Sequence, residues 1–156
     1  MWIHLNEPSH FDDFVTLNTA WITRYFTLEP PDFELFSRPE SIIEQGGCIL
    51  SLSIAYEAPT TVVAGVCALL RKSDSLFELS KMAVDERFQG QGLGDALMRA
   101  AFDWANRSGA EKLTLITNSR LTPAIAMYRK HGFVTIWEGP HPEYTRGDVI
   151  MEKSLD

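Results

Sequence analysis

The chain of 156 residues lacks any apolar run long enough to cross a membrane. Its first ten residues, MWIHLNEPSH, have neither the basic nor the apolar segment of a secretory leader. Basic residues are the minority, with 14 Lys and Arg against 21 Asp and Glu, and they form no block. Because phosphate backbones are bound by clustered cations, we expect no nucleic-acid partner. We also expect no membrane partner and a cytoplasmic location.

Cysteine is scarce, and the two that occur, Cys48 and Cys67, lie in apolar segments without the spacing of a metal or redox motif. They are expected to be reduced core residues, with a disulfide or a metal pair as the less favoured alternative. The four histidines also lack metal-ligand spacing, so no metal cofactor is expected. The net charge of −7 suits a cationic small-molecule substrate, although solubility explains it equally well.

The length predicts one domain, residues 1–156, with its own core. Alternating or continuous apolar residues predict strands at 2–6, 48–57, 62–71, 76–84, 112–117, 133–139 and 148–155. Helical spacing predicts helices at 9–26, within 28–47, from 93 to a stop at Gly109, and at 122–132. The short turns make the strands at 48–84 antiparallel, whereas the long helix makes those at 76–84 and 112–117 parallel. The predicted fold class is α/β (α+β): a mixed, mostly antiparallel sheet of six to seven strands with helices on both faces.

Three glycines alternate in RFQGQGLGDALM, between a predicted strand and a strong helix. Such a turn exposes several backbone N–H groups beside the positive end of the helix, which favours an anion and above all a phosphate. A close-packed turn without a ligand is the alternative. The spacing is GxGxG, so it is neither a P-loop nor the GxGxxG of a dinucleotide fold.

The segment MAVDERFQGQGLGDALM resembles the acetyl-CoA-binding motif of the GNAT superfamily of N-acetyltransferases, Q/R-x-x-G-x-G/A, which Gln89, Gly92 and Gly94 fill in register. The segment PAIAMYRKHGF resembles the second signature of that superfamily, A-x-x-x-Y-x-x-x-G-F. The close match covers about residues 76–136. The resemblance implies a GNAT-like domain in which the fourth and fifth strands splay apart at a bulge.

The resemblance implies acetyl-CoA as co-substrate, with its pyrophosphate on backbone N–H groups of Gln89, Gly90, Gln91, Gly92, Leu93 and Gly94. The pantetheine arm would pair with backbone groups of Met82 and Val84, and the oxyanion would lie near Ala83 or Val84. One departure is Leu121, which stands where the family has a pantetheine-binding Asn. Asn118 either replaces it or is a turn residue, and the sequence leaves both alternatives open.

Transfer to an amine needs a base, because only about one alkyl amine in 2,500 is unprotonated at pH 7. Glu78 is the candidate base, in register with the glutamate that some GNAT enzymes use. Strict alternation would place it on one face with Ser80, Met82 and Val84. The alternative is a solvated or lysine-paired glutamate. Tyr128 matches the tyrosine that protonates the departing thiolate in many GNAT enzymes, and core packing is its alternative.

The acceptor is expected to be a small-molecule amine or an amino acid, bound between the first helices and the loop before the last strand. Candidate residues are Tyr25, Glu29, Asp32, Tyr144 and Arg146. Glu29 and Asp32 suit an amine and Arg146 suits a carboxylate, although surface or capping roles are the more common for such residues. A protein or peptide N-acetyltransferase and a non-catalytic acetyl-CoA sensor remain alternatives, and a homodimer is compatible with the sequence.

Overall fold

One sheet with the strand order β1-β2-β3-β4-β5-β7-β6 forms the centre of the computed structural model, which describes residues 1–142 and 145–155. The strands are β1 (Trp2–Leu5), β2 (Cys48–Ala55), β3 (Thr61–Arg71), β4 (Leu76–Val84), β5 (Lys112–Thr117), β6 (Val134–Glu138) and β7 (Val149–Ser154). Every neighbouring pair is antiparallel except β4 and β5, which are parallel. The predicted fold class is confirmed.

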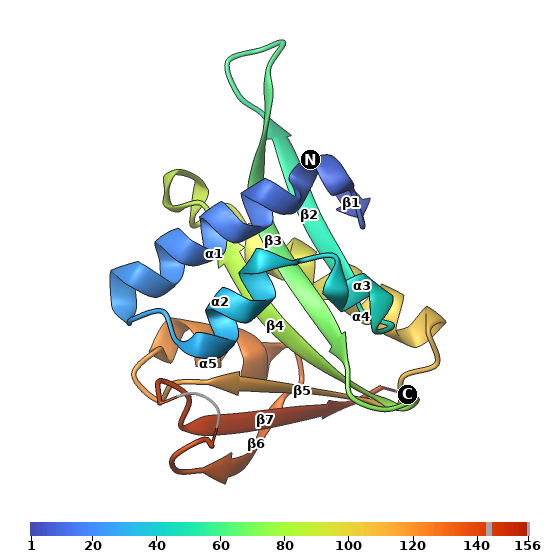
Figure 1. The fold of residues 1–156 in the computed structure, drawn as a ribbon, viewed down its shortest axis with the longest axis vertical. Helices are drawn as coiled ribbons and strands as arrows, with labels where there is room; N and C mark the ends of the chain where they lie inside the picture. Colours follow the sequence, from blue (N-terminus) through green and yellow to red (C-terminus); the bar gives the residue numbers. More distant parts are fainter. Residues whose placement is uncertain (143–144, 156) are drawn as a thin grey trace.

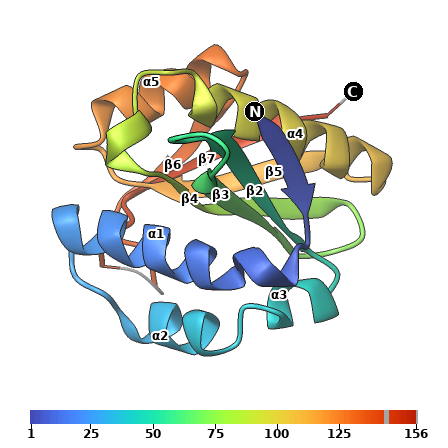
Figure 2. The same ribbon diagram turned by 90° about the horizontal axis from the view of Figure 1, so that it is seen from above.

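Helices cover both faces of this sheet (Figure 1 and Figure 2). On one face lie α1 (Phe11–Tyr25), α2 (Pro30–Ser37) and α3 (Ser41–Glu44), and on the other lie α4 (Leu93–Arg107) and α5 (Thr122–Lys130). Short 3-10 turns at Pro8–His10 and Glu86–Phe88 precede α1 and α4. Each face has its own core: Leu97 and Phe133 belong to the cluster on the α4 side, and Phe14 and Val66 to that on the α1 side.

Strands β4 and β5 part soon after they begin. They pair only where Leu76, Phe77 and Glu78 face Lys112, Leu113 and Thr114. Beyond that point β4 stays with β3, while β5 pairs with β7 as far as Thr117. One edge of β4 from Leu79 onward therefore has no strand partner among the described residues, and the expected splay is confirmed.

A bulge interrupts β4 at Lys81. Ser80 lies opposite Ala68 and Ala83 lies opposite Val66, so three steps along β4 match two along β3. Lys81 has φ +54°, in the left-handed region that non-glycine residues rarely adopt.

The extra residue changes which side chains share a face. Glu78 and Ser80 lie opposite Leu70 and Ala68, on the α1 side of the sheet. Met82 and Val84 instead pack against the core on the α4 side. The prediction that these four residues share one face was therefore wrong, because strict alternation cannot account for a bulge.

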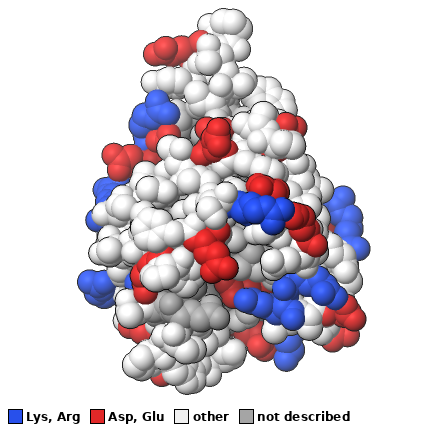
Figure 3. Space-filling model, in the orientation of Figure 1, with Lys and Arg blue, Asp and Glu red and all other residues white. Residues whose placement is uncertain are grey.

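Charged side chains of both signs are interspersed on the face shown in Figure 3. Within the described residues, no helix has the length and apolarity needed to cross a membrane.

Candidate active site

A cavity of about 110 Å³ lies where β4 and β5 separate, and it is called the gap cavity below. Glu78 and Tyr128, the two predicted catalytic residues, both line it. Residues 79–82 of β4, 115–117 of β5 and Asn118 directly after it form the walls, together with Trp21 of α1 and Arg146 of the loop before β7. The splay thus brings the two candidates to one space, although they stand 50 residues apart in the chain.

Glu78 is buried, with 8% of its surface exposed, and its neighbours Phe77 and Leu79 belong to the core. Its Oε1 lies 3.3 Å from Nζ of Lys72, a partly exposed residue just after β3. The carboxylate is therefore paired with a lysine and also lines the gap cavity, and its role as the base stays a prediction. A carboxylate in this position can accept a proton from a group that enters the cavity.

Tyr128 projects from α5 with its ring edge-on to Phe133, at a centroid distance of 6.1 Å. Burial raises the pKa of its hydroxyl to about 12, with a smaller contribution from Cys67. The hydroxyl is therefore protonated at neutral pH and can act as a hydrogen-bond donor.

The three glycines of the turn have two different roles. Gly90 and Gly92 have φ +81° and +79°, and a Cβ built on either would meet no atom within 4 Å. Their glycine requirement is one of backbone conformation, since the space around them is open. Gly94 differs, because its Cβ would lie 3.2 Å from the sulfur of Met127. The absence of a side chain at Gly94 therefore lets Met127 of α5 lie close to the first turn of α4.

Helix α4 begins at Leu93, directly after Gly92, which has no side chain to cap it. The first N–H groups of a helix have no partner within the helix, and Gly92 offers no side chain to accept from them. Gln89 lies beside this turn, with Nε2 3.5 Å from the carbonyl oxygen of Val84. The glycine turn therefore lies next to the edge of β4 at Met82, Ala83 and Val84, which has no strand partner among the described residues.

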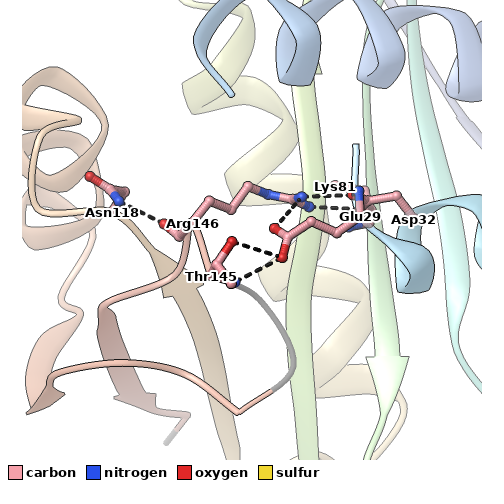
Figure 4. Close-up of polar contacts among 6 residues, drawn as sticks. All are labelled: Glu29, Asp32, Lys81, Asn118, Thr145 and Arg146. Atoms are coloured by element: carbon pink, nitrogen blue, oxygen red, sulfur yellow. Dashed lines mark hydrogen bonds and ion pairs between the residues drawn. The ribbon is translucent and has the colours of Figure 1, made fainter. Parts of the chain in front are cut away.

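Acidic and basic side chains from three segments meet on the α1 side of the gap (Figure 4). Asp32 of α2, with no exposed side-chain surface, accepts two hydrogen bonds of 2.6 Å from Arg146. It also accepts one of 2.8 Å from Lys81 and one of 2.8 Å from the backbone N–H of Glu29. Arg146 reaches Glu29 as well, at 3.0 Å, and Glu29 accepts a hydrogen bond from the backbone N–H of Thr145. We call Glu29, Asp32, Lys81 and Arg146 the ion cluster.

The ion cluster places the acceptor candidates differently from the prediction. Glu29, Asp32 and Arg146 are brought together, but they bind one another, so Arg146 is not held ready for a carboxylate. Lys81 was missed, although a lone lysine inside an apolar strand was a signal for it. Tyr144 lies outside the described residues.

The pKa of Asp32 reports the strength of this arrangement. Burial by itself raises the pKa, but the hydrogen bonds from Arg146 and Lys81 outweigh it and hold the pKa at about 2. Burial lowers the pKa of Lys81, against the effect of Asp32. Two buried positive and two negative charges thus compensate one another.

Asn118 has the contacts of a turn residue. Its side-chain amide donates to the carbonyl of Arg146 at 2.7 Å, and its Oδ1 accepts from the backbone N–H of Arg120 at 2.9 Å. It also lines the gap cavity, so its part in binding pantetheine stays a prediction. Tyr25 is 44% exposed and lies against Trp21, at a centroid distance of 5.6 Å.

Comparison with known proteins identifies the family of this chain. Residues 14–133 match the Acetyltransferase (GNAT) family. A relative from Bacillus subtilis, named an uncharacterized N-acetyltransferase, YobR, is 26% identical over 121 residues, covering 78% of this chain and 48% of its own length. The chain therefore spans about half the length of that curated relative.

Solved structures show the same fold. A GNAT-family acetyltransferase from Staphylococcus aureus superposes with a TM-score of 0.84 at 16% identity, over 99% of this chain and 100% of its own. The protein yncA from Salmonella typhimurium, described as a putative acetyltransferase with its cofactor acetyl-CoA, gives a TM-score of 0.75 at 21% identity, over 100% of this chain and 94% of its own.

Proposed function

Since the chain belongs to the acetyltransferase (GNAT) family, we propose that it transfers the acetyl group of acetyl-CoA to a primary amine of a small molecule or amino acid. Family membership indicates acyltransferase activity, and the acetyl donor and the amine acceptor are the proposal. The observation that carries it is the gap cavity, because Glu78 and Tyr128 line it and the glycine turn lies at the adjacent end of β4. We propose that residues 1–156 act as one such domain.

The coenzyme binds through backbone groups. Its pyrophosphate lies on the N–H groups of residues 89–94, where Gly90 and Gly92 leave room for close approach. The pantetheine arm runs along the unpaired edge of β4, using Met82 and Val84. The thioester then enters the gap cavity near the bulge, where a backbone N–H of Ala83 or Val84 stabilises the oxyanion.

The acceptor amine attacks the thioester carbonyl from the α1 side. Glu78 accepts the proton that the amine must lose, directly or through one water molecule. Glu78 lies on the α1 face of β4, whereas the side chains of Met82 and Val84 lie on the α4 face, so the bulge separates the proposed base from the core-facing part of the strand.

Tyr128 stabilises the leaving sulfur. With its pKa raised to about 12, full proton transfer to a thiolate is unfavourable, since the thiol pKa is about 8.5. The phenol therefore acts by donating a hydrogen bond while negative charge develops on sulfur. The thiolate takes its proton from solvent after release.

The test is direct. Calorimetric titration with acetyl-CoA measures binding, and incubation with a panel of amines and one of peptides measures the thiol released. Binding with turnover on small amines supports the proposal. Turnover confined to peptides would favour a protein acetyltransferase, and binding without any turnover would favour a sensor. No binding of acetyl-CoA would overturn the proposal altogether.

A further inference from the structure

A second hollow, of about 330 Å³, adjoins the gap cavity. The two share Trp21, Phe26 and Leu121 as lining residues. The remaining lining residues of this outer hollow are Tyr25, Arg120, Pro123 and Ala124. Its wall is thus aromatic and aliphatic, with one cation.

Arg120 differs from the two cations of the gap cavity. Lys81 and Arg146 are both bound to Asp32. Arg120 forms no ion pair with any described residue, and its Nε is oriented by Oδ1 of Asn118 at 3.3 Å. Its guanidinium carbon lies 5.0 Å from the ring centroid of Phe26. A guanidinium held in this way presents its outer N–H groups to an anion, and a carboxylate suits its fork of donors.

We infer that the outer hollow binds the body of the acceptor, and that the acceptor carries an apolar, preferably aromatic, group and a carboxylate that pairs with Arg120. This rests on the proposed function, since the amine must reach Glu78 in the gap cavity. The aromatic walls of Trp21 and Phe26 favour a ring, because offset and edge-on ring contacts add to simple burial. An amino acid with an aromatic side chain combines all three groups.

Three amines separate these contributions: phenylalanine, phenethylamine, which lacks the carboxylate, and alanine, which lacks the ring. We expect phenylalanine to have the lowest KM of the three. The Arg120→Gln variant should raise the KM for phenylalanine at least tenfold, leave that for phenethylamine within about twofold, and leave the KM for acetyl-CoA unchanged. Arg129→Gln, on the exposed side of α5, is the matched control and should change none of them.

Two results would overturn this assignment. A rise in the KM for acetyl-CoA in Arg120→Gln would place the coenzyme in the outer hollow. Equal KM values for the three amines would remove the ring and carboxylate from recognition. If acetyl-CoA binds without turnover, the subsite can still be tested by titrating phenylalanine into the protein with coenzyme A bound. Binding lost in Arg120→Gln supports the subsite, whereas no binding to the unaltered protein overturns it.

The bulge of β4 at Lys81 supports a second, independent inference. Lys81 is held with φ +54° while its Nζ lies 2.8 Å from Asp32 and 5.8 Å from the ring of Phe36. A left-handed residue with a Cβ is strained, and such strain persists only where surrounding contacts hold it. We infer that the Lys81–Asp32 pair is a positioning device, which fixes the bulge and thereby the edge of β4 that receives the thioester.

Replacing Lys81 by glycine or by alanine distinguishes the effect of the backbone conformation from the effect of the ammonium charge. Glycine adopts the left-handed conformation without help, so Lys81→Gly should keep kcat within about threefold. Alanine lacks both the ion pair and that freedom, so Lys81→Ala should lower kcat at least tenfold while the KM for the amine changes little. Asp32 keeps its two bonds to Arg146 in both variants, and thermal unfolding checks that both fold.

Equal large losses of kcat in the two variants would mean that the ammonium group itself is required. Near-normal kcat in both would mean that the bulge needs no such pair. Either result overturns the positioning role.

Discussion

The two sides of the gap between β4 and β5 are built by different means. On the side proposed for the coenzyme, the turn at residues 89–94 and the edge of β4 offer backbone N–H and C=O groups, and the turn has glycine at three positions. On the side proposed for the acceptor, side chains of α2, β4 and the loop before β7 bind one another in the ion cluster. A backbone site depends on a few neighbouring residues, whereas the cluster depends on contacts across 114 positions of sequence.

The largest effect is expected from Asp32→Asn, on the acceptor side. This change leaves Lys81 and Arg146 buried without a full countercharge, and breaking a buried pair in this way costs about 3–5 kcal/mol of unfolding free energy. Asp103→Asn, on an exposed position of α4, is the control and should lie within about 0.5 kcal/mol of the unaltered protein. Urea unfolding of the three proteins measures both. A small loss in Asp32→Asn would mean that the cluster does not hold this side together.

The same residue gives a pH dependence. The pKa of Asp32 is about 2 in the folded protein, below the value of about 3.9 in an unfolded chain. Its contribution is therefore complete above about pH 4 and is lost as the pH falls toward 2. Unfolding measured across that window should show a shallower decline for Asp32→Asn than for the unaltered protein; parallel curves would contradict the assignment.

Glu78→Gln is expected to lower acetyl transfer about a hundredfold at pH 7, because the amide cannot accept the amine proton. The loss should shrink at higher pH, where more of the amine arrives unprotonated, and the affinity for acetyl-CoA should stay unchanged. Rates of both proteins from about pH 6 to 10 on the best acceptor provide the test, with the amine pKa near 10.4. Equal rates throughout would assign the proton transfer to another group or to water.

Gly92→Ala sharpens the comparison from the coenzyme side. The added methyl group meets no protein atom within 4 Å, and in the proposed complex it would stand in the space left for the pyrophosphate. We expect acetyl-CoA to bind about thirtyfold more weakly, which corresponds to one charge-assisted hydrogen bond of roughly 2 kcal/mol. Gly109→Ala is a matched control, since Gly109 has φ +82° and equally open surroundings at the other end of α4. Both variants should lose similar stability, and only Gly92→Ala should lose affinity by calorimetry.

The smallest effect is expected from Tyr128→Phe. Removing one hydrogen bond to the departing sulfur should lower kcat about tenfold, or roughly 1.4 kcal/mol. The ring stays against Phe133, so the affinity for acetyl-CoA and the melting temperature should be retained. Unchanged kcat would return Tyr128 to a packing role.

The sequence predicted the sheet because its strands depend on local patterns, whereas the coenzyme contacts of residues 89–94 stay a prediction. The apolar alternation gave the strands, and the parallel pairing of β4 and β5 followed from the long helix between them. The prediction that Glu78 and Met82 share one face of β4 was wrong, because a bulge inserts one residue without any change in composition.

The ion cluster could not be predicted in the same way. Glu29, Asp32 and Arg146 were each recognised as candidates, but their mutual pairing depends on how the loop before β7 crosses the sheet. Nothing local in the sequence distinguishes an arginine bound to Asp32 from Arg120, which has no such partner among the described residues.

The short contact between β4 and β5 has a mechanical consequence. Three residue pairs at Leu76–Glu78 join the β1–β4 half of the sheet to the β5–β7–β6 half, like two leaves on a single hinge. A molecule bound between the separated ends of β4 and β5 would push the two halves of the sheet apart about these three residue pairs. The ion cluster then works as a clasp across the opening, because it ties α2 and β4 of one leaf to the loop that leads into β7 of the other. Glu78 is itself one of the three β4 residues that join the two halves, so any change in their relative position would also move its carboxylate.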